Sequence, residues 1–230
     1  MALVQSIFES TEQLNSAFCE RISHLLRDAI DKRGSASLIV SGGRTPAALF
    51  NALSQVDLAW ENVSISLADE RWVSPDDEAS NEKMLRANLL VNRASLAKFV
   101  PLKTQHANAE DAVMACEANF AQVAQPFDVV ILGMGEDGHT ASLFPCSAQI
   151  AQGLDLSSKR MFIAVQPTTA PNQRMSLTLP ALLRAEHVFL HLTGSSKKDV
   201  LAKALAGDDE LAMPIRAVLK HANVELMWAP

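Results

Sequence analysis

Cysteine is scarce in this chain of 230 residues. The three cysteines, Cys19, Cys116 and Cys146, are odd in number and far apart, so they provide neither a disulfide framework nor the closely spaced ligand pairs of a zinc site. Cys19 and Cys116 fall within helical patterns, and we expect both to be small core residues. The sequence therefore predicts no metal site.

Long apolar runs and an excess of positive charge are also lacking. No stretch is long and apolar enough to span a bilayer, and residues 1–10 do not have the basic region followed by an apolar run of a secretory signal. The net charge of −6 provides no basic surface for nucleic acid or anionic lipid. We expect a cytoplasmic monomer or homodimer with no nucleic-acid or membrane partner. An anionic ligand would need a local cluster of donors, because the overall charge repels it.

The chain does contain a regular alternation of helical and strand patterns. Between Ser10 and Lys32, apolar residues recur every four positions, which predicts an amphipathic helix. Ser10 with Gln13 resembles a capping box at its start, and Gly34 is a typical stop. Short apolar runs predict strands at residues 37–43, 63–67, 127–132, 161–165, 187–192 and 224–228. Further helices are expected at residues 81–91, 109–123, 196–205 and 214–219.

This alternation predicts an α/β fold with a Rossmann-like, mainly parallel sheet flanked by helices on both faces. The sequence shows no internal repeat, no low-complexity segment and no linker rich in Pro, Gly or Ser, so we expect one domain over residues 1–230. In such sheets, ligands bind at the carboxyl ends of the strands. The unusual polar residues of the chain fall at those positions.

The first unusual segment, Ser41-Gly-Gly-Arg-Thr-Pro46, follows a predicted strand and opens a helix. Gly42 and Gly43 allow close approach of the backbone to a ligand, with Thr45 as N-cap and Pro46 at the first helical position. Free N–H groups at a helix start form a ready phosphate site. A plain strand-to-helix turn explains the same residues equally well.

A second segment follows the strand at residues 127–132, where a glycine loop carries Asp137 and His139. Histidine is the side chain best suited to move protons near neutral pH. A single buried histidine is usually structural, but a histidine in a glycine-rich loop at the carboxyl end of a strand favours catalysis. The segment also matches G-x-G-x-x-G through Gly133, Gly135 and Gly138.

A dinucleotide site is the alternative reading of those glycines, and it is disfavoured on three counts. Asp137 would lie beside the pyrophosphate, the loop is in the middle of the chain, and the next strand ends in Ala164-Val-Gln-Pro167 without the acid that binds a ribose.

Five further charged residues are candidates. Asp69 is at the end of a predicted strand, where a substrate would lie. Glu70 and Arg71 follow it, and they are either functional groups or a pair of solvated loop residues. Arg174 and Lys197 could each bind a phosphate or be an ordinary surface cation.

Taken together, these segments resemble the 6-phosphogluconolactonase family. The matching stretches are Ser41–Pro46, Asp69–Arg71 with Ser80-Asn81, Leu132–Pro145 and Arg174–Pro180. The resemblance implies a Rossmann-like sheet, no obligatory cofactor, and hydrolysis of a phosphorylated sugar lactone in the oxidative pentose phosphate pathway. It also implies that His139 is the catalytic base.

A sister family, the glucosamine-6-phosphate deaminases and isomerases, has a glutamate five residues after this histidine. Phe144 occupies that position here and cannot relay a proton, so the sequence favours the lactonase. The same relationship implies that Arg174 and Lys197 form a phosphate clamp. Arg44 stands where the family often has a small residue, and no role is assigned to its side chain.

The expected mechanism anchors the phosphate on Arg174, Lys197 and the N–H groups of Gly42, Gly43 and Thr45. His139 then takes a proton from the water that attacks C1. N–H groups around Gly135, or Arg71, stabilise the carbonyl oxygen. Asp137 or Asp69 orients the imidazole, and no metal is needed because a lactone carbonyl is already reactive. A non-catalytic sugar-phosphate binder is the second class of function; it would need the cations but not His139.

Overall fold

The computed structural model describes residues 3–230 and contains a seven-stranded sheet in the order β1-β10-β9-β6-β2-β3-β5. Neighbouring strands of this sheet pair in parallel throughout. In that order the strands are Leu3–Ile7, Val224–Ala229, Ala185–Thr193, Phe127–Leu132, Ala36–Val40, Val63–Leu67 and Lys98–Val100. The predicted α/β class and parallel sheet are confirmed.

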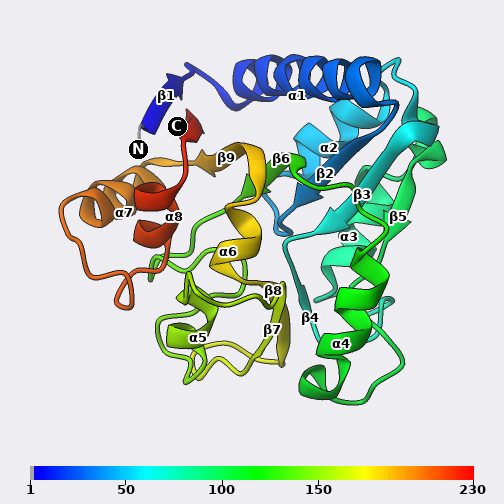
Figure 1. Cartoon of the computed structure of the whole chain (residues 1–230). Coiled ribbons are helices and arrows are strands. Elements are labelled where there is room, and N and C mark those ends of the chain that lie inside the picture. The colour runs from blue at the N-terminus through cyan, green and yellow to red at the C-terminus, as the bar shows by residue number, and fades with distance from the viewer. Residues whose placement is uncertain (1–2) are drawn as a thin grey trace.

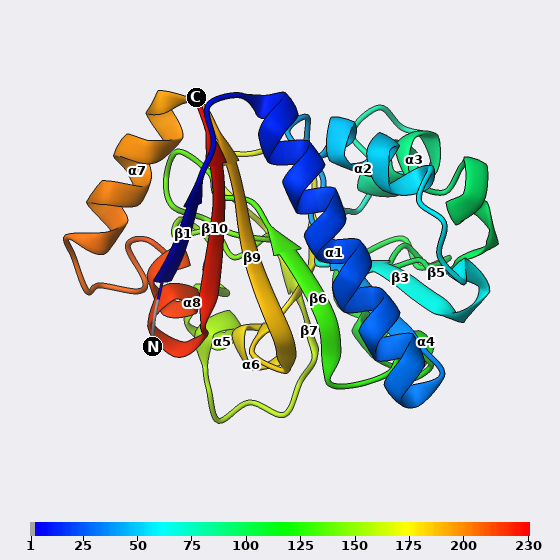
Figure 2. The same cartoon turned by 90° about the horizontal axis from the view of Figure 1, so that it is seen from above.

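Helices lie on both faces of this sheet, as predicted. Figure 1 shows α1 and α2 above the sheet and α4, α5 and α6 below it, and Figure 2 shows α1 lying over the sheet alongside β6. The helices are α1 (Thr11–Arg33), α2 (Ala47–Ser54), α3 (Asn81–Asn88), α4 (Ala109–Phe120), α5 (Ile150–Leu154), α6 (Leu179–Leu182), α7 (Ser195–Leu205) and α8 (Ile215–His221). Short 3₁₀ turns are found at Trp60–Asn62 and Asn92–Leu96.

Helix α1 follows its sequence signals closely. The Ser10 hydroxyl accepts a hydrogen bond from the N–H of Gln13 at 3.2 Å. Gly34 ends the helix in the left-handed region at φ +76°, which a residue with a Cβ rarely adopts. Phe18 and Ile22 of the four-residue apolar stripe are fully buried, whereas Ile30, near the end of the helix, is only partly buried.

The start of α2 differs from the prediction by one position. Pro46, not Thr45, is the cap residue, and the helix begins at Ala47. Thr45 instead lines the cavity described below. The prediction was wrong because a Thr-Pro pair marks a helix start only to within a residue or so.

A second, antiparallel sheet was not predicted. It has three strands in the order β4 (Asp69–Arg71), β8 (Arg174–Leu177) and β7 (Phe162–Val165). Periodicity indicated a strand only for β7, because β4 is too short and β4 and β8 both carry charges that read as loop. Strand β4 begins one residue after β3, so the chain passes directly from one sheet to the other. As a result, the side chains of Asp69 and Glu70 in β4 are buried.

The topology places a crevice between β2 and β6. From β2 the chain continues to β3 on one side, whereas from β6 it continues to β9 on the other. Such a divergence point is where open parallel sheets bind ligands. Every residue of β2 and β6 is buried, so only the loops at their carboxyl ends are free to carry polar chemistry.

The core of this sheet contains a buried histidine. His191, on β9, is 4% exposed and packs edge-on against Phe18 at 5.3 Å between ring centroids. Neither ring nitrogen has a hydrogen-bond partner within residues 3–230. Burial lowers the pKa of His191 to about 4, because the charged form would lose its hydration.

This burial makes folding sensitive to acid. The folded pKa of His191 is below the unfolded value of about 6.5, so its contribution to stability is complete above pH 6.5 and is lost as the pH falls towards 4. Between pH 7 and pH 5 the loss amounts to about 2 kcal/mol. Urea unfolding of His191→Leu at both pH values should show that much less acid destabilisation than the wild type. An unchanged difference between the two pH values would contradict this assignment.

Candidate active site

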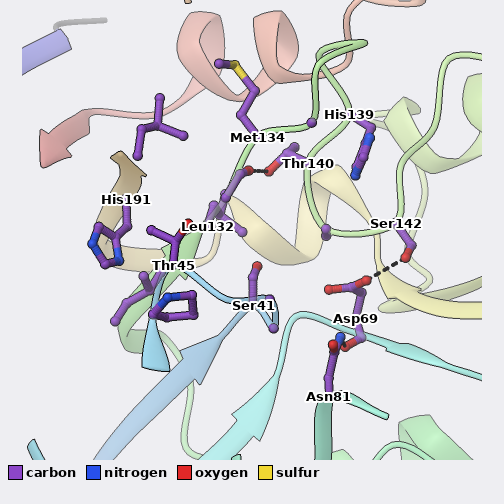
Figure 3. Close-up of a pocket in the computed structure, with 18 of the residues that line it drawn as sticks. Ser41, Thr45, Asp69, Asn81, Leu132, Met134, His139, Thr140, Ser142 and His191 are labelled. Atoms are coloured by element: carbon purple, nitrogen blue, oxygen red, sulfur yellow. Dashed lines mark hydrogen bonds between the residues drawn. The ribbon is translucent and has the colours of Figure 1, made fainter. Parts of the chain in front are cut away.

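A cavity of about 400 Å³ opens at the carboxyl ends of β2, β3, β6 and β9. Most site residues predicted from the sequence line it: Gly42, Gly43, Thr45, Asp69, Arg71, Gly135, His139, Arg174 and Lys197. Asp137 is outside this lining and contacts His139 instead. Figure 3 shows His139 at one side of the cavity and Thr45 at the other.

His139 is paired with Asp137. The imidazole Nδ1 lies 2.6 Å from Asp137 Oδ1, and the His139 N–H donates to the same oxygen at 3.1 Å. Burial raises the pKa of Asp137, but the hydrogen bonds from His139 outweigh it and hold the pKa below its ordinary value. Asp137 is therefore an anion that accepts the Nδ1 proton. This leaves Nε2 with a lone pair that can take a proton from another molecule.

Gly135 permits this geometry. A Cβ at Gly135 would lie 2.1 Å from His139 Nδ1, so any side chain there would displace the imidazole. The Gly135 N–H donates to the His139 carbonyl at 2.8 Å. That N–H is already bonded and not free for an oxyanion, so the neighbouring N–H groups of the loop and Arg71 remain the predicted donors for charge stabilisation.

Phe144 covers the imidazole. The two rings stack at 4.1 Å between centroids with an interplanar angle of 26°. The guanidinium carbon of Arg174 lies 5.7 Å from the same Phe144 ring. An apolar ring thus contacts the histidine at the position where the sister family has a carboxylate.

Asp69 bonds to a different partner. It is 6% exposed, and its Oδ2 accepts a hydrogen bond from the Ser142 hydroxyl at 2.5 Å (Figure 3). Between Thr140 and Ser142, Ala141 has φ +46°, a region that alanine seldom adopts. Hydrogen bonds on both sides hold this strained loop, since the Thr140 hydroxyl also donates to the Gly133 carbonyl at 2.8 Å. Of the two carboxylates proposed to orient the base, Asp137 is the one in contact with it.

Two arginines face each other across the small sheet. Arg71 and Arg174 are directly opposite in the β4–β8 pairing, and both line the cavity. Neither Nε has a partner in the described part of the chain, although Arg71 also donates to the Ala79 carbonyl and Arg174 to that of Pro171. Burial, and then the charge of Arg71, lower the pKa of Arg174. Opposed like charges are unfavourable, so an anion in the cavity would relieve them.

Glu70 connects β4 to the start of α3. It is 1% exposed rather than solvated, because its carboxylate caps α3 by accepting the N–H groups of Asn81 and Glu82 at 2.8 Å each. The Asn81 amide in turn donates to the Asp69 carbonyl at 2.9 Å. A Cβ at Gly42 would lie 1.9 Å from Asn81 Oδ1, so glycine is required where α3 packs against the loop after β2.

The remaining cation of the site lies at the start of α7. Lys197 is in the first turn of that helix, where the helix dipole favours anions. Its Nζ lies 2.8 Å from Glu136 Oε1. Glu136 was not among the predicted site residues.

Several polar residues that line the cavity were not among the predicted site residues. Of these, Ser41, Asn81, Thr140 and Ser142 lie within the segments that carry the family resemblance, whereas His191 and Thr193 lie outside them. Ser41 and Thr193 lie at or just beyond strand ends, a signal that could have identified them. His191 lies inside a strand and gave no such signal.

Two other classes of site find no support. After β6 no helix begins before Ile150 in the described chain, so the glycine loop lacks the helix N-terminus that a dinucleotide pyrophosphate uses. Within residues 3–230, no three His, Cys, Asp or Glu side chains cluster as metal ligands would, and none of the helices there has the length and apolarity to cross a membrane.

Comparison with known proteins gives a consistent result. Residues 9–228 match the family model described as "Glucosamine-6-phosphate isomerases/6-phosphogluconolactonase". A 6-phosphogluconolactonase from Rhizobium meliloti is 41% identical, with 100% of each chain covered, and one from Neisseria meningitidis is 41% identical, with 94% of each covered.

Solved structures agree with these sequence matches. The crystal structure of a 6-phosphogluconolactonase from Shewanella baltica superposes with a TM-score of 0.97 at 44% identity, over 100% of this chain and 98% of that one. A monomeric glucosamine-6-phosphate deaminase, at 17% identity and a TM-score of 0.79 over 99% and 97% of the two chains, shares the fold. The chain therefore belongs to the family of glucosamine-6-phosphate isomerases and 6-phosphogluconolactonases.

Proposed function

We propose that this protein hydrolyses 6-phospho-D-glucono-1,5-lactone to 6-phospho-D-gluconate, a step of the oxidative pentose phosphate pathway in the cytoplasm. One observation carries the proposal: a histidine backed by an ionised carboxylate shares a cavity with three cationic side chains. The names of the relatives support the same substrate. The apolar Phe144 beside the histidine favours lactone opening over deamination.

The phosphate is the anchor of the substrate. It docks on Arg174 and Lys197 and on the N–H groups at Gly42, Gly43 and Thr45. Gly43, at φ +109° with open space around it, gives the loop its turn. Binding energy from this remote group holds the lactone carbonyl beside His139 and lowers the barrier by positioning.

Proton transfer then runs through His139. Nε2 removes a proton from water as the water oxygen bonds to C1, and Asp137 stabilises the resulting imidazolium. The carbonyl oxygen becomes negative and is stabilised by Arg71. When the tetrahedral intermediate collapses, the bond from C1 to the ring oxygen breaks, and His139 returns the proton to that oxygen. Asp69, held by Ser142, accepts hydrogen bonds from substrate hydroxyls.

A non-catalytic sugar-phosphate binder remains the second class of function. Such a protein would need the cations, but it would have no use for the contact between His139 and Asp137 or for a glycine at position 135. Measured turnover of the lactone separates the two classes.

Replacing His139 by alanine should reduce enzymatic hydrolysis by about 10²- to 10⁴-fold, the usual contribution of a general base. Binding of 6-phosphogluconate should be nearly intact, because the phosphate is held by other residues. Hydrolysis is followed by proton release, with spontaneous opening of the lactone subtracted. Full turnover by folded His139→Ala would refute its assignment as the base.

Arg174→Ala and Lys197→Ala should each lower kcat/KM for the phosphorylated lactone far more than for unphosphorylated gluconolactone. Loss of one charge-assisted hydrogen bond costs about 1.5–3 kcal/mol, or roughly 10- to 150-fold in kcat/KM. Lys198→Ala is the matched control, because its ammonium lies over the Trp228 ring at 4.5 Å instead of in the cavity. An equal loss for both substrates would mean that Arg174 and Lys197 do not bind the phosphate.

The protein should not release ammonia from glucosamine 6-phosphate. Deamination requires protons to be moved between the ring oxygen, C1 and C2, which calls for a second acid near the histidine, and Phe144 has no titratable group. Ammonia release is assayed beside lactone hydrolysis on the same preparation. Comparable rates would overturn the preference for the lactonase and would require another carboxylate, such as Glu136 or Asp69, to replace the missing glutamate.

A further inference from the structure

The cation at the start of α7 already has an anionic partner. Lys197 Nζ and Glu136 Oε1 are 2.8 Å apart, and the Lys197 side chain lines the cavity. A phosphate that binds Lys197 approaches an ammonium group that this carboxylate already neutralises in part. The two anions repel each other, so the ion pair opposes binding of the phosphate.

The two partners come from different parts of the site. Glu136 lies in the loop after β6, next to Asp137 and three residues before His139, whereas Lys197 follows β9. The pair thus joins the loop that carries the histidine to the cation that faces the phosphate.

The exposure of the two side chains determines how easily the pair opens. The Glu136 side chain is 64% exposed and that of Lys197 is 25% exposed. Solvated ion pairs are weak, while a phosphate dianion carries more charge and also gains from the N-terminus of α7. The phosphate should therefore displace Glu136 and not be excluded by it.

We propose that Glu136 is a displaceable counter-ion of Lys197, which lowers affinity for phosphorylated ligands and so favours product release. The proposal rests on the proposed function, in which Lys197 binds the substrate phosphate. Glu136 is a positioning residue: it has no contact with the reacting atoms and acts through Lys197. If Glu136 served only to hold the lysine in place, its removal would weaken ligand binding, which is the opposite result.

The test is a double-mutant cycle on the full chain, with 6-phosphogluconate as the probe and calorimetry as the readout. Glu136→Gln should tighten binding about two- to fivefold, the range expected from loss of an exposed ion pair. In a Lys197→Met background, the same substitution should have no effect. Asp57→Asn is the charge-matched control, because Asp57 also forms an exposed ion pair, with Arg93. Asp57 precedes β3 and so lies at the opposite end of the strands from the cavity. This control substitution should leave binding unchanged.

The outcomes separate the two proposals. Unchanged or weaker binding in Glu136→Gln, or equal tightening with and without Lys197, would overturn the counter-ion role. If Lys197→Met itself binds 6-phosphogluconate as well as the wild type, the phosphate assignment of the proposed function fails instead. As a kinetic check, Glu136→Gln should show stronger product inhibition of lactone hydrolysis by a similar factor.

Discussion

The parallel pairing of β2 with β6 is the constraint on which the rest of the site depends. Both strands are buried along their whole length, so polar chemistry can enter only where they end. From this pair the chain diverges to β3 on one side and to β9 on the other, and the loops at the divergence enclose the cavity. The pairing of β2 with β6 brings the glycine loop after β2 and the histidine loop after β6 together.

The charges of the site are arranged against the overall charge of the protein. The chain carries a net charge of −6, yet Arg71, Arg174 and Lys197 converge on one cavity. Burying two opposed guanidinium groups is unfavourable, and the neighbouring carboxylates of Asp69 and Glu70 offset part of that cost. The cavity thus concentrates positive charge in a protein whose net charge is negative, and an anionic substrate would neutralise that charge.

Much of this arrangement could be predicted from the sequence, because the strongest signals are local. The four-residue stripe and glycine stop of α1, the buried runs of β2 and β6, and the loops at their ends all appear as predicted. The small antiparallel sheet could not be predicted, since β4 and β8 are short and their charges are buried only through tertiary contacts. For the same reason the sequence left Glu70 open between a catalytic group and a solvated loop residue. The choice between Asp137 and Asp69 required the Ser142 hydroxyl, 73 residues from Asp69, which no spacing reveals.

The central claim is that a phosphate anchored on the cations places C1 of the substrate beside the base. A crystal structure with 6-phosphogluconate bound tests it most directly. The account predicts that the phosphate contacts Arg174 and Lys197 and that the C1 carboxylate of the product lies beside His139, with one of its oxygens at hydrogen-bond distance, about 3 Å, from Nε2. A phosphate bound beside His139, or C1 on the far side of the cavity near Thr45, would contradict it.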